Sequence, residues 1–192
     1  MLWPFNYFRR PDRSPAPTIE VIYGMIVTRV REPVFYRDLG VPDTVDGRFD
    51  LLLLHLWMVL RRLRTAEDGM EPAQALFDRF CEDMDDNLRE MGVGDLAVPR
   101  RMQAFGEAFY GRSRAYDLAL GQEADQETDH ASERAREALA QAIAKNILDG
   151  GDLDRAQALA AYTMATATSL AACDDAAMLL GAWSFPPTFE RR

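Results

Sequence analysis

The residues that could carry out chemistry are few in this chain and lie far apart in the sequence. They include two histidines, His55 and His130, and two cysteines, Cys81 and Cys173. Acid–base or nucleophilic catalysis needs such a group within hydrogen-bond reach of a partner that activates it. His55 lies in the most apolar segment, where a core histidine with satisfied hydrogen bonds is the more common case. We therefore predict that the chain is not an enzyme.

The acidic residues do not form a specific metal-binding pattern either. His130 has Glu127 and Glu133 at helical offsets, but any acidic helix surface produces this spacing. The run 82–86 has the composition of a divalent-ion site, yet successive residues of a helix point in different directions and cannot converge on one ion. Phosphate-binding glycine loops and nucleophile-elbow motifs are absent from the sequence. We predict no metal and no other cofactor.

Size and composition indicate one domain with a sizeable core. The chain has 192 residues, of which 48% are hydrophobic. Its net charge of −9 argues against direct binding to nucleic acid, which needs clustered basic residues. The most apolar run, 51–60, is too short to span a bilayer, which takes about 18 or more apolar residues. Two widely spaced cysteines fit a reducing compartment, so we expect a cytoplasmic protein.

The elements that must position these residues are predicted to be helices. Apolar residues recur at helical spacing along the chain, and no convincing segment has the period of two that is typical of a strand. We expect an all-α fold, a single compact bundle of about six helices. The expected helices span about 18–31, 48–64, 71–91, 98–120, 130–149 and 152–179.

Particular residues are expected to set the helix ends and contacts. The second helix is apolar nearly all round, so we place it at the centre, with Asp43 or Asp46 as its N-cap. Gly92 is expected to end the third helix in a left-handed conformation. Gly106 and Gly111 lie inside the fourth helix, where glycine costs about 1 kcal/mol relative to alanine. They suggest a close helix contact or a local break.

The two ends of the chain differ in composition from the helical part. Residues 1–17 form an arm rich in proline, arginine and aromatic residues, which we expect to be flexible. The helical domain is predicted to span 18–182, and the tail 183–192 carries aromatic residues expected to fold back on the bundle. The arm lacks the apolar region and cleavage site of a secretory signal. A peripheral contact of the arm with the inner face of the inner membrane stays an open alternative.

Three segments, 39–50, 83–101 and 109–116, carry more mixed chemistry than packing alone requires. Each combines arginine or aspartate with glycine, proline or an aromatic residue. Tyrosine and arginine are enriched at binding hot spots, which favours a protein-binding role for these segments. The alternative, that they are loop, cap and helix-contact residues, stays open.

The motifs in these segments carry a resemblance to a known family. In chain order they are Phe35-Tyr36, Leu39-Gly40-Val41-Pro42-Asp43-Thr44, Asp46-Gly47-Arg48-Phe49-Asp50, Asp83-Met84-Asp85, Leu88-Arg89-Glu90-Met91-Gly92-Val93-Gly94-Asp95, Val98-Pro99-Arg100, Phe109-Tyr110-Gly111-Arg112 and Ala115-Tyr116. This set resembles the ubiquinol–cytochrome c chaperone family, the Cbp3-type assembly factors of the cytochrome bc1 complex, over about 35–175. The chain is similar to a short bacterial form, since it lacks the long N-terminal region of mitochondrial members. Arg100 stands where we expect a lysine, and it keeps the charge.

The resemblance implies a helical, non-enzymatic assembly factor. Mitochondrial members of the family act with a small partner protein, bind newly made cytochrome b and contact the mitochondrial ribosome. For this chain the resemblance implies cytochrome b or another bc1 subunit as client, with a small partner protein left open, and ribosome contact is not carried over. The alternative is a generic protein-interaction bundle with no respiratory role.

The residues expected to bind a partner are the charged and aromatic members of the later motifs. They are Asp83, Arg89, Glu90, Asp95, Arg100, Tyr110, Arg112 and Tyr116. We expect a groove near the third and fourth helices to receive an apolar or amphipathic client segment. In this arrangement Arg89, Arg112 and Tyr110 line the groove, and Asp83 and Glu90 hold the arginines.

Overall fold

The computed structural model describes residues 17–121 and 129–188, and every regular element in these two ranges is an α-helix. Six helices are long and two, α2 and α8, are short. In chain order they are α1 Pro17–Val30, α2 Pro33–Arg37, α3 Val45–Leu63, α4 Met70–Glu90, α5 Val98–Gly121, α6 Asp129–Ile147, α7 Leu153–Ala171 and α8 Asp175–Leu180. The prediction of an all-α bundle of about six helices is confirmed.

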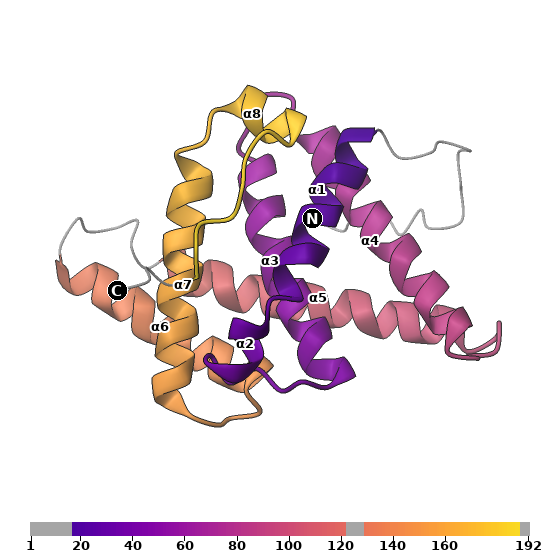
Figure 1. Cartoon of the computed structure of the whole chain (residues 1–192), viewed down its shortest axis with the longest axis horizontal. Coiled ribbons are helices and arrows are strands. Elements are labelled where there is room, and N and C mark those ends of the chain that lie inside the picture. Colours follow the sequence, from indigo (N-terminus) through magenta and orange to yellow (C-terminus); the bar gives the residue numbers. More distant parts are fainter. Residues whose placement is uncertain (1–16, 122–128, 189–192) are drawn as a thin grey trace.

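Helix α3 forms the centre of the bundle. Every residue from Leu51 to Leu60 is buried, and α3 contacts α1, α4, α5, α6, α7 and α8. Figure 1 shows α3 behind α1, with α5 running crosswise and α7 on the opposite side from α4. A helix that is apolar on all sides is stable only when other elements surround it. The predicted central position of this helix is therefore confirmed.

Thr44, and neither of the two predicted aspartates, caps α3. Its hydroxyl oxygen accepts a hydrogen bond from the backbone N–H of Gly47 at 3.1 Å. Asp43 is held instead by Arg48, at 2.6 Å, and Asp46 lies within the first turn, where its charge favours the helix dipole. The predicted caps were wrong because all three candidates have suitable side chains and only the backbone geometry selects one.

The predicted last helix is divided into α7 and α8. Asp174 accepts a hydrogen bond from Ala177 N at 2.8 Å and so starts α8 as a new helix. Arg62 of α3 holds the junction, donating to the carbonyl oxygen of Cys173 at 2.5 Å and to Asp175 at 2.6 Å. The break thus involves both a local cap and a contact from a distant helix. The segment between the first two predicted helices contains the short helix α2, which was not predicted.

Glycines behave differently at the end of α4 and within α5. Gly92 has a φ of +79° and ends α4, as predicted. Gly106 and Gly111 interrupt nothing, because α5 continues through both. A Cβ added at either position would meet no heavy atom within 4 Å. Both explanations suggested for them, a close helix contact and a local break, were wrong.

The C-terminal tail folds back on the bundle, as its aromatic residues led us to expect. Trp183 and Phe185 pack against the core, and the Phe185 ring centroid lies 5.4 Å from that of His55. Arg29 donates a hydrogen bond to the carbonyl oxygen of Pro186. Phe189 and the arm 1–16 lie outside the described residues, so the proposed division at 17 and 182 stays a prediction. Among the described helices, none is both long and apolar enough to cross a membrane.

Candidate protein-binding site

The buried histidine takes part in a complete hydrogen-bond network. His55 Nδ1 lies 2.9 Å from the Leu51 carbonyl oxygen, which can only accept, so Nδ1 carries the proton. Nε2 then accepts from the Tyr162 hydroxyl at 2.8 Å, and that oxygen accepts from Arg29 Nε at 3.1 Å. Burial lowers the pKa of His55 to about 4. His55 is therefore a neutral core histidine with both ring nitrogens satisfied, as predicted.

The other residues that could carry out chemistry are either unreactive or face different partners. Burial raises the pKa of Cys81 to about 12, which leaves its thiol protonated and unreactive at neutral pH. In the acidic run 82–86, Asp83 faces Tyr23 of α1, whereas Asp85 faces Arg89. No three His, Cys, Asp or Glu side chains of the described part are placed to hold a metal ion. The side chain of His130 lies outside that part.

Arg89 holds the end of α4 to the following loop. Its Nε lies 2.6 Å from Asp85 Oδ2, and its Nη1 pairs with Asp95. Asp83, which we expected to hold an arginine of the site, instead accepts from the Tyr23 hydroxyl at 2.8 Å. Glu90 is exposed and forms no ion pair with any described residue. The expected pairing was wrong because Asp85, four residues before Arg89, shares its helix face, while Asp83 faces α1.

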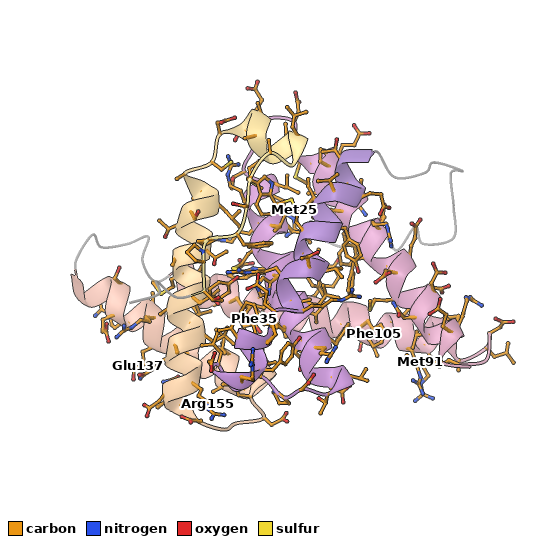
Figure 2. The ribbon with its side chains drawn as sticks, viewed as in Figure 1. Met25, Phe35, Met91, Phe105, Glu137 and Arg155 are labelled. Carbon is orange, nitrogen blue, oxygen red and sulfur yellow. The ribbon has the colours of Figure 1, made fainter. Side chains whose placement is uncertain are left out.

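The connection between α4 and α5 projects from the bundle and exposes apolar side chains. Leu96 is 99% exposed and Met91 is 60% exposed. Leu88 of α4 and Val98 and Met102 of α5 form a small buried apolar cluster. Figure 2 shows Met91 at the outer end of α4, far from Phe35 in the middle of the bundle. We call this loop, residues 91–97, the α4–α5 tip.

Arg112 joins two helices inside the bundle. Its Nη2 lies 2.6 Å from Asp50 Oδ1, linking α5 to the first turns of α3. The hydrogen-bond geometry is incomplete, because Asp50 Oδ1 and Arg112 Nε are buried without a well-formed hydrogen bond. Burial raises the pKa of Asp50 to about 6, although the Arg112 charge opposes this. Arg112 is therefore engaged with α3, and it does not line the hollows that contain Tyr110.

Tyr116 is a core residue. Its side chain is 0% exposed, and its ring centroid lies 5.1 Å from that of Trp57 on α3. Tyr116 follows Phe109 and Arg112 at helical spacing on the inner side of α5, which explains its burial. A partner cannot touch a fully buried ring, so the prediction of Tyr116 as a contact residue was wrong.

Tyr110 lies on the outer side of α5, in an open groove of about 770 Å³. The apolar residues of this groove are Phe109, Tyr110 and Leu118, and its charged residues are Arg64, Arg114 and Asp117. We call it the Tyr110 groove. A small hollow lined in part by Met70 and Phe77 adjoins it, because the two share Arg64 and Tyr110.

The structure thus separates the predicted partner-binding residues into three places. Arg89, Glu90, Asp95 and Arg100 lie at or beside the α4–α5 tip, and Tyr110 lies in the groove; Asp83, Arg112 and Tyr116 make contacts between helices.

Sequence reasoning missed Arg64, Arg114 and Leu118 of the groove and Leu96 of the tip. A spacing of four residues from Tyr110 to Arg114 and on to Leu118 was a usable signal. Nothing local in the sequence places Arg64 beside Tyr110.

Comparison with known proteins identifies a family and individual relatives. The family model described as ubiquinol-cytochrome C chaperone matches residues 37–185. The ubiquinol-cytochrome-c reductase complex assembly factor 1 of Xenopus laevis is 26% identical over 97 residues, which is 50% of this chain and 48% of that protein. The Drosophila melanogaster assembly factor 1 is 24% identical over 106 residues, or 52% of this chain and 41% of that protein. The chain spans about half, or less, of the length of these curated relatives.

A solved structure shares the fold over nearly its full length. The Cbp3 homolog from Brucella abortus is 32% identical, with a TM-score of 0.76, over 89% of this chain and 90% of that chain. The family match covers more than half of the chain and includes α3 to α8. The chain belongs to the ubiquinol-cytochrome C chaperone family.

Proposed function

We propose that this chain is an assembly factor of the ubiquinol–cytochrome c reductase complex, which holds an apolar segment of a newly made subunit. Cytochrome b is the subunit we expect as client. Membership of the family and the names of the frog and fly relatives support this role. We place the protein in the cytoplasm, at the inner face of the inner membrane where such a client emerges, and we propose no catalytic step.

The Tyr110 groove is the observation that carries the proposal. Leu118 is 63% exposed and Tyr110 is 40% exposed, so apolar surface faces solvent along one side of α5. Apolar patches that stay exposed on a folded domain commonly mark protein-binding sites. A groove between helices can receive the apolar side of another helix, and this is a recurring mode of peptide recognition. A nascent membrane helix has such an apolar surface.

The interior of the bundle supports a binding role over a catalytic one. Burial lowers the pKa of His55 to about 4 and raises the pKa of Asp50 to about 6, so these are the groups whose shifted pKa values could suggest acid–base chemistry. Both are buried in α3, and neither lines the Tyr110 groove. The groove offers aromatic and aliphatic side chains with arginine at its edge, which suits recognition of a segment and not bond cleavage.

Gene deletion tests the proposed role. In a cell that makes this protein, deletion should lower cytochrome b, measured by its haem difference spectrum, and ubiquinol–cytochrome c reductase activity in membranes. Unchanged cytochrome b and reductase activity would favour the alternative, a generic protein-interaction bundle.

Complementation tests the groove as the client site. Tyr110→Ala combined with Leu118→Ser should fail to restore cytochrome b, because both remove apolar contact area from the groove. Leu153→Ser is the matched control, since Leu153 is similarly exposed at 53% but lies at the start of α7. Circular dichroism should show equal helicity in all variants. Full complementation by the groove variant would place the client elsewhere, with the α4–α5 tip as the next surface to test.

A further inference from the structure

The Tyr110 groove carries positive charge on a chain that is acidic as a whole. The net charge of the chain is −9, yet Arg64 and Arg114 are exposed at the groove and pair with no described carboxylate. Asp117, the acidic residue of the groove, is already engaged. It accepts a hydrogen bond from Trp57 Nε1 at 2.9 Å and lies 3.8 Å from Arg61. Among the described residues, the groove therefore presents two guanidinium groups with hydrogen bonds left to donate.

The order of side chains along α5 defines the spacing that an occupant must match. Tyr110, Arg114 and Leu118 follow one another at intervals of four, so they share one side of the helix. The row is apolar, basic and apolar. Tyr110 and Leu118 are separated by about 12 Å along α5, roughly two helical turns, at 1.5 Å per residue. Arg64, at the end of α3, adds the second positive charge beside this row.

These features fit one class of occupant better than others. An α-helix lying along the row presents apolar side chains two turns apart, at i and i+7, to Tyr110 and Leu118. A carboxylate at i+3 or i+4 then lies between them, within reach of Arg114 and Arg64. Arginine binds carboxylates through paired, directional hydrogen bonds, whereas a lysine in the same place faces like charge. A segment that is only apolar leaves both arginines unused.

We propose that the Tyr110 groove selects a helical client segment that carries apolar residues at i and i+7 and a carboxylate at i+3 or i+4, bound by Arg64 and Arg114. The inference rests on the proposed function for the nature of the occupant, an apolar segment of a nascent membrane subunit. It adds that the segment carries a negative charge and that Arg64 and Arg114 recognise this charge. Arg64 and Arg114 set specificity, while Tyr110 and Leu118 supply apolar contact.

Binding of matched peptides to the full chain tests the selection. The probes are fluorescein-labelled helical peptides with leucine at i and i+7 and glutamate, glutamine or lysine at both i+3 and i+4. Fluorescence anisotropy should rank them glutamate, glutamine, lysine, with the lysine peptide about three- to tenfold weaker than the glutamate peptide. Equal affinities, or no binding by any peptide, would overturn the proposal.

Charge reversal in the groove provides the decisive variant. Arg64→Glu combined with Arg114→Glu should reverse the preference, so that the lysine peptide binds more tightly than the glutamate peptide. Arg37→Glu combined with Arg134→Glu is the matched control, because both arginines are exposed and lie outside the groove. The control should keep the original ranking, which separates a local effect from a change in net charge. If the reversal variant does not fold, Arg64→Gln with Arg114→Gln should abolish the ranking.

Anionic vesicles distinguish a lipid surface from a client segment. Sedimentation with vesicles of phosphatidylglycerol and phosphatidylcholine should not depend on Arg64 and Arg114. If the groove variants lose vesicle binding while the peptides show no ranking, the arginines serve a membrane and the proposal is wrong. Failure of the peptide ranking leaves the deletion phenotype untouched, so it does not by itself refute the assembly role. An unchanged cytochrome b level after deletion refutes that role whatever the peptides show.

Discussion

Helix α3 buries two ionisable side chains, His55 and Asp50, and the two differ in how completely they are hydrogen-bonded. His55 has a partner for each ring nitrogen and sits in a network that extends through Tyr162 to Arg29. Asp50 has Arg112 as its ion-pair partner, but buried polar atoms of both residues lack well-formed hydrogen bonds. A complete network specifies one arrangement of helices, whereas an incomplete one is a weak source of stability. We therefore expect the polar contact between α3 and α7 to stabilise the bundle more than the polar contact between α3 and α5.

Removing Arg29 should have the largest effect. Arg29 is 8% exposed, bonds Tyr162 and Glu32, and lies over the ring of Phe185 at 5.8 Å. Arg29→Met should lower the free energy of unfolding by about 3–4 kcal/mol, because the Tyr162 hydroxyl and Pro186 carbonyl oxygens lose their shared donor and Glu32 loses its cation. Urea denaturation followed by circular dichroism measures this.

Arg48→Met is the matched control for the Arg29 variant. Arg48 also has a carboxylate partner, Asp43, and an aromatic neighbour, Tyr36, but it is exposed. Its loss should not measurably change stability. Equal destabilisation by the two substitutions would contradict the larger contribution to stability that we expect from the buried Arg29 network.

The Asp50–Arg112 pair should behave differently from the His55 network when both partners are replaced. Arg112→Leu alone should cost about 2–4 kcal/mol, because it leaves a buried carboxylate without its cation. Asp50→Leu with Arg112→Leu should recover most of that loss, because no charge then remains to be solvated in the interior. Chemical denaturation of the single and double variants measures both changes in the free energy of unfolding. A double variant less stable than Arg112→Leu would show that the pair is a net source of stability.

The two buried groups should make stability depend on pH with opposite signs. The pKa of His55 is lowered from 6.5 to about 4, so its contribution is complete above pH 6.5 and is lost as the pH falls toward 4. The pKa of Asp50 is raised from 3.8 to about 6, so its contribution is complete below pH 3.8 and is lost as the pH rises through 6. Each amounts to about 1–3 kcal/mol at most.

Urea midpoints between pH 4 and 7 follow both contributions, which oppose each other over much of the same window. His55→Gln should make stability fall more steeply as the pH rises through this window, and Asp50→Asn should make it rise more steeply. A profile that neither substitution changes would mean that the two residues titrate alike in the folded and unfolded chains.

The smallest expected effect concerns two glycines of α5, the helix that supplies Arg112. Gly106→Ala and Gly111→Ala should each raise the free energy of unfolding by about 0.5–1 kcal/mol, because alanine favours helix and the added Cβ meets no neighbour. Thermal melts measure the gain. If either substitution lowers cytochrome b in cells while stabilising the protein, a client or partner approaches α5 closely at that glycine. Unchanged or lowered melting temperatures would show that the helix is strained there.

Much of the fold follows from local patterns that a single sequence displays. Apolar residues at helical spacing predicted the six long helices, and the all-round apolar character of 51–60 predicted the central position of α3. The end of α4 at Gly92 and the core role of His55 were also predictable, since each depends on residues close in sequence. The division of α7 from α8 was not predicted, although it involves a local cap at Asp174 as well as Arg62 on another helix.

The sequence by itself determined which segments are helical, which of them is buried on all sides, and which family the chain resembles. Only the tertiary structure decided which functional side chains meet. It brought Arg112 to Asp50, Asp83 to Tyr23, and Arg64 to Tyr110, and it buried Tyr116 completely. The physical reason is that periodicity fixes the faces of one helix, whereas the face that stays open depends on how all the helices cross. The Tyr110 groove exists because two helices leave their charged and apolar residues side by side at the surface.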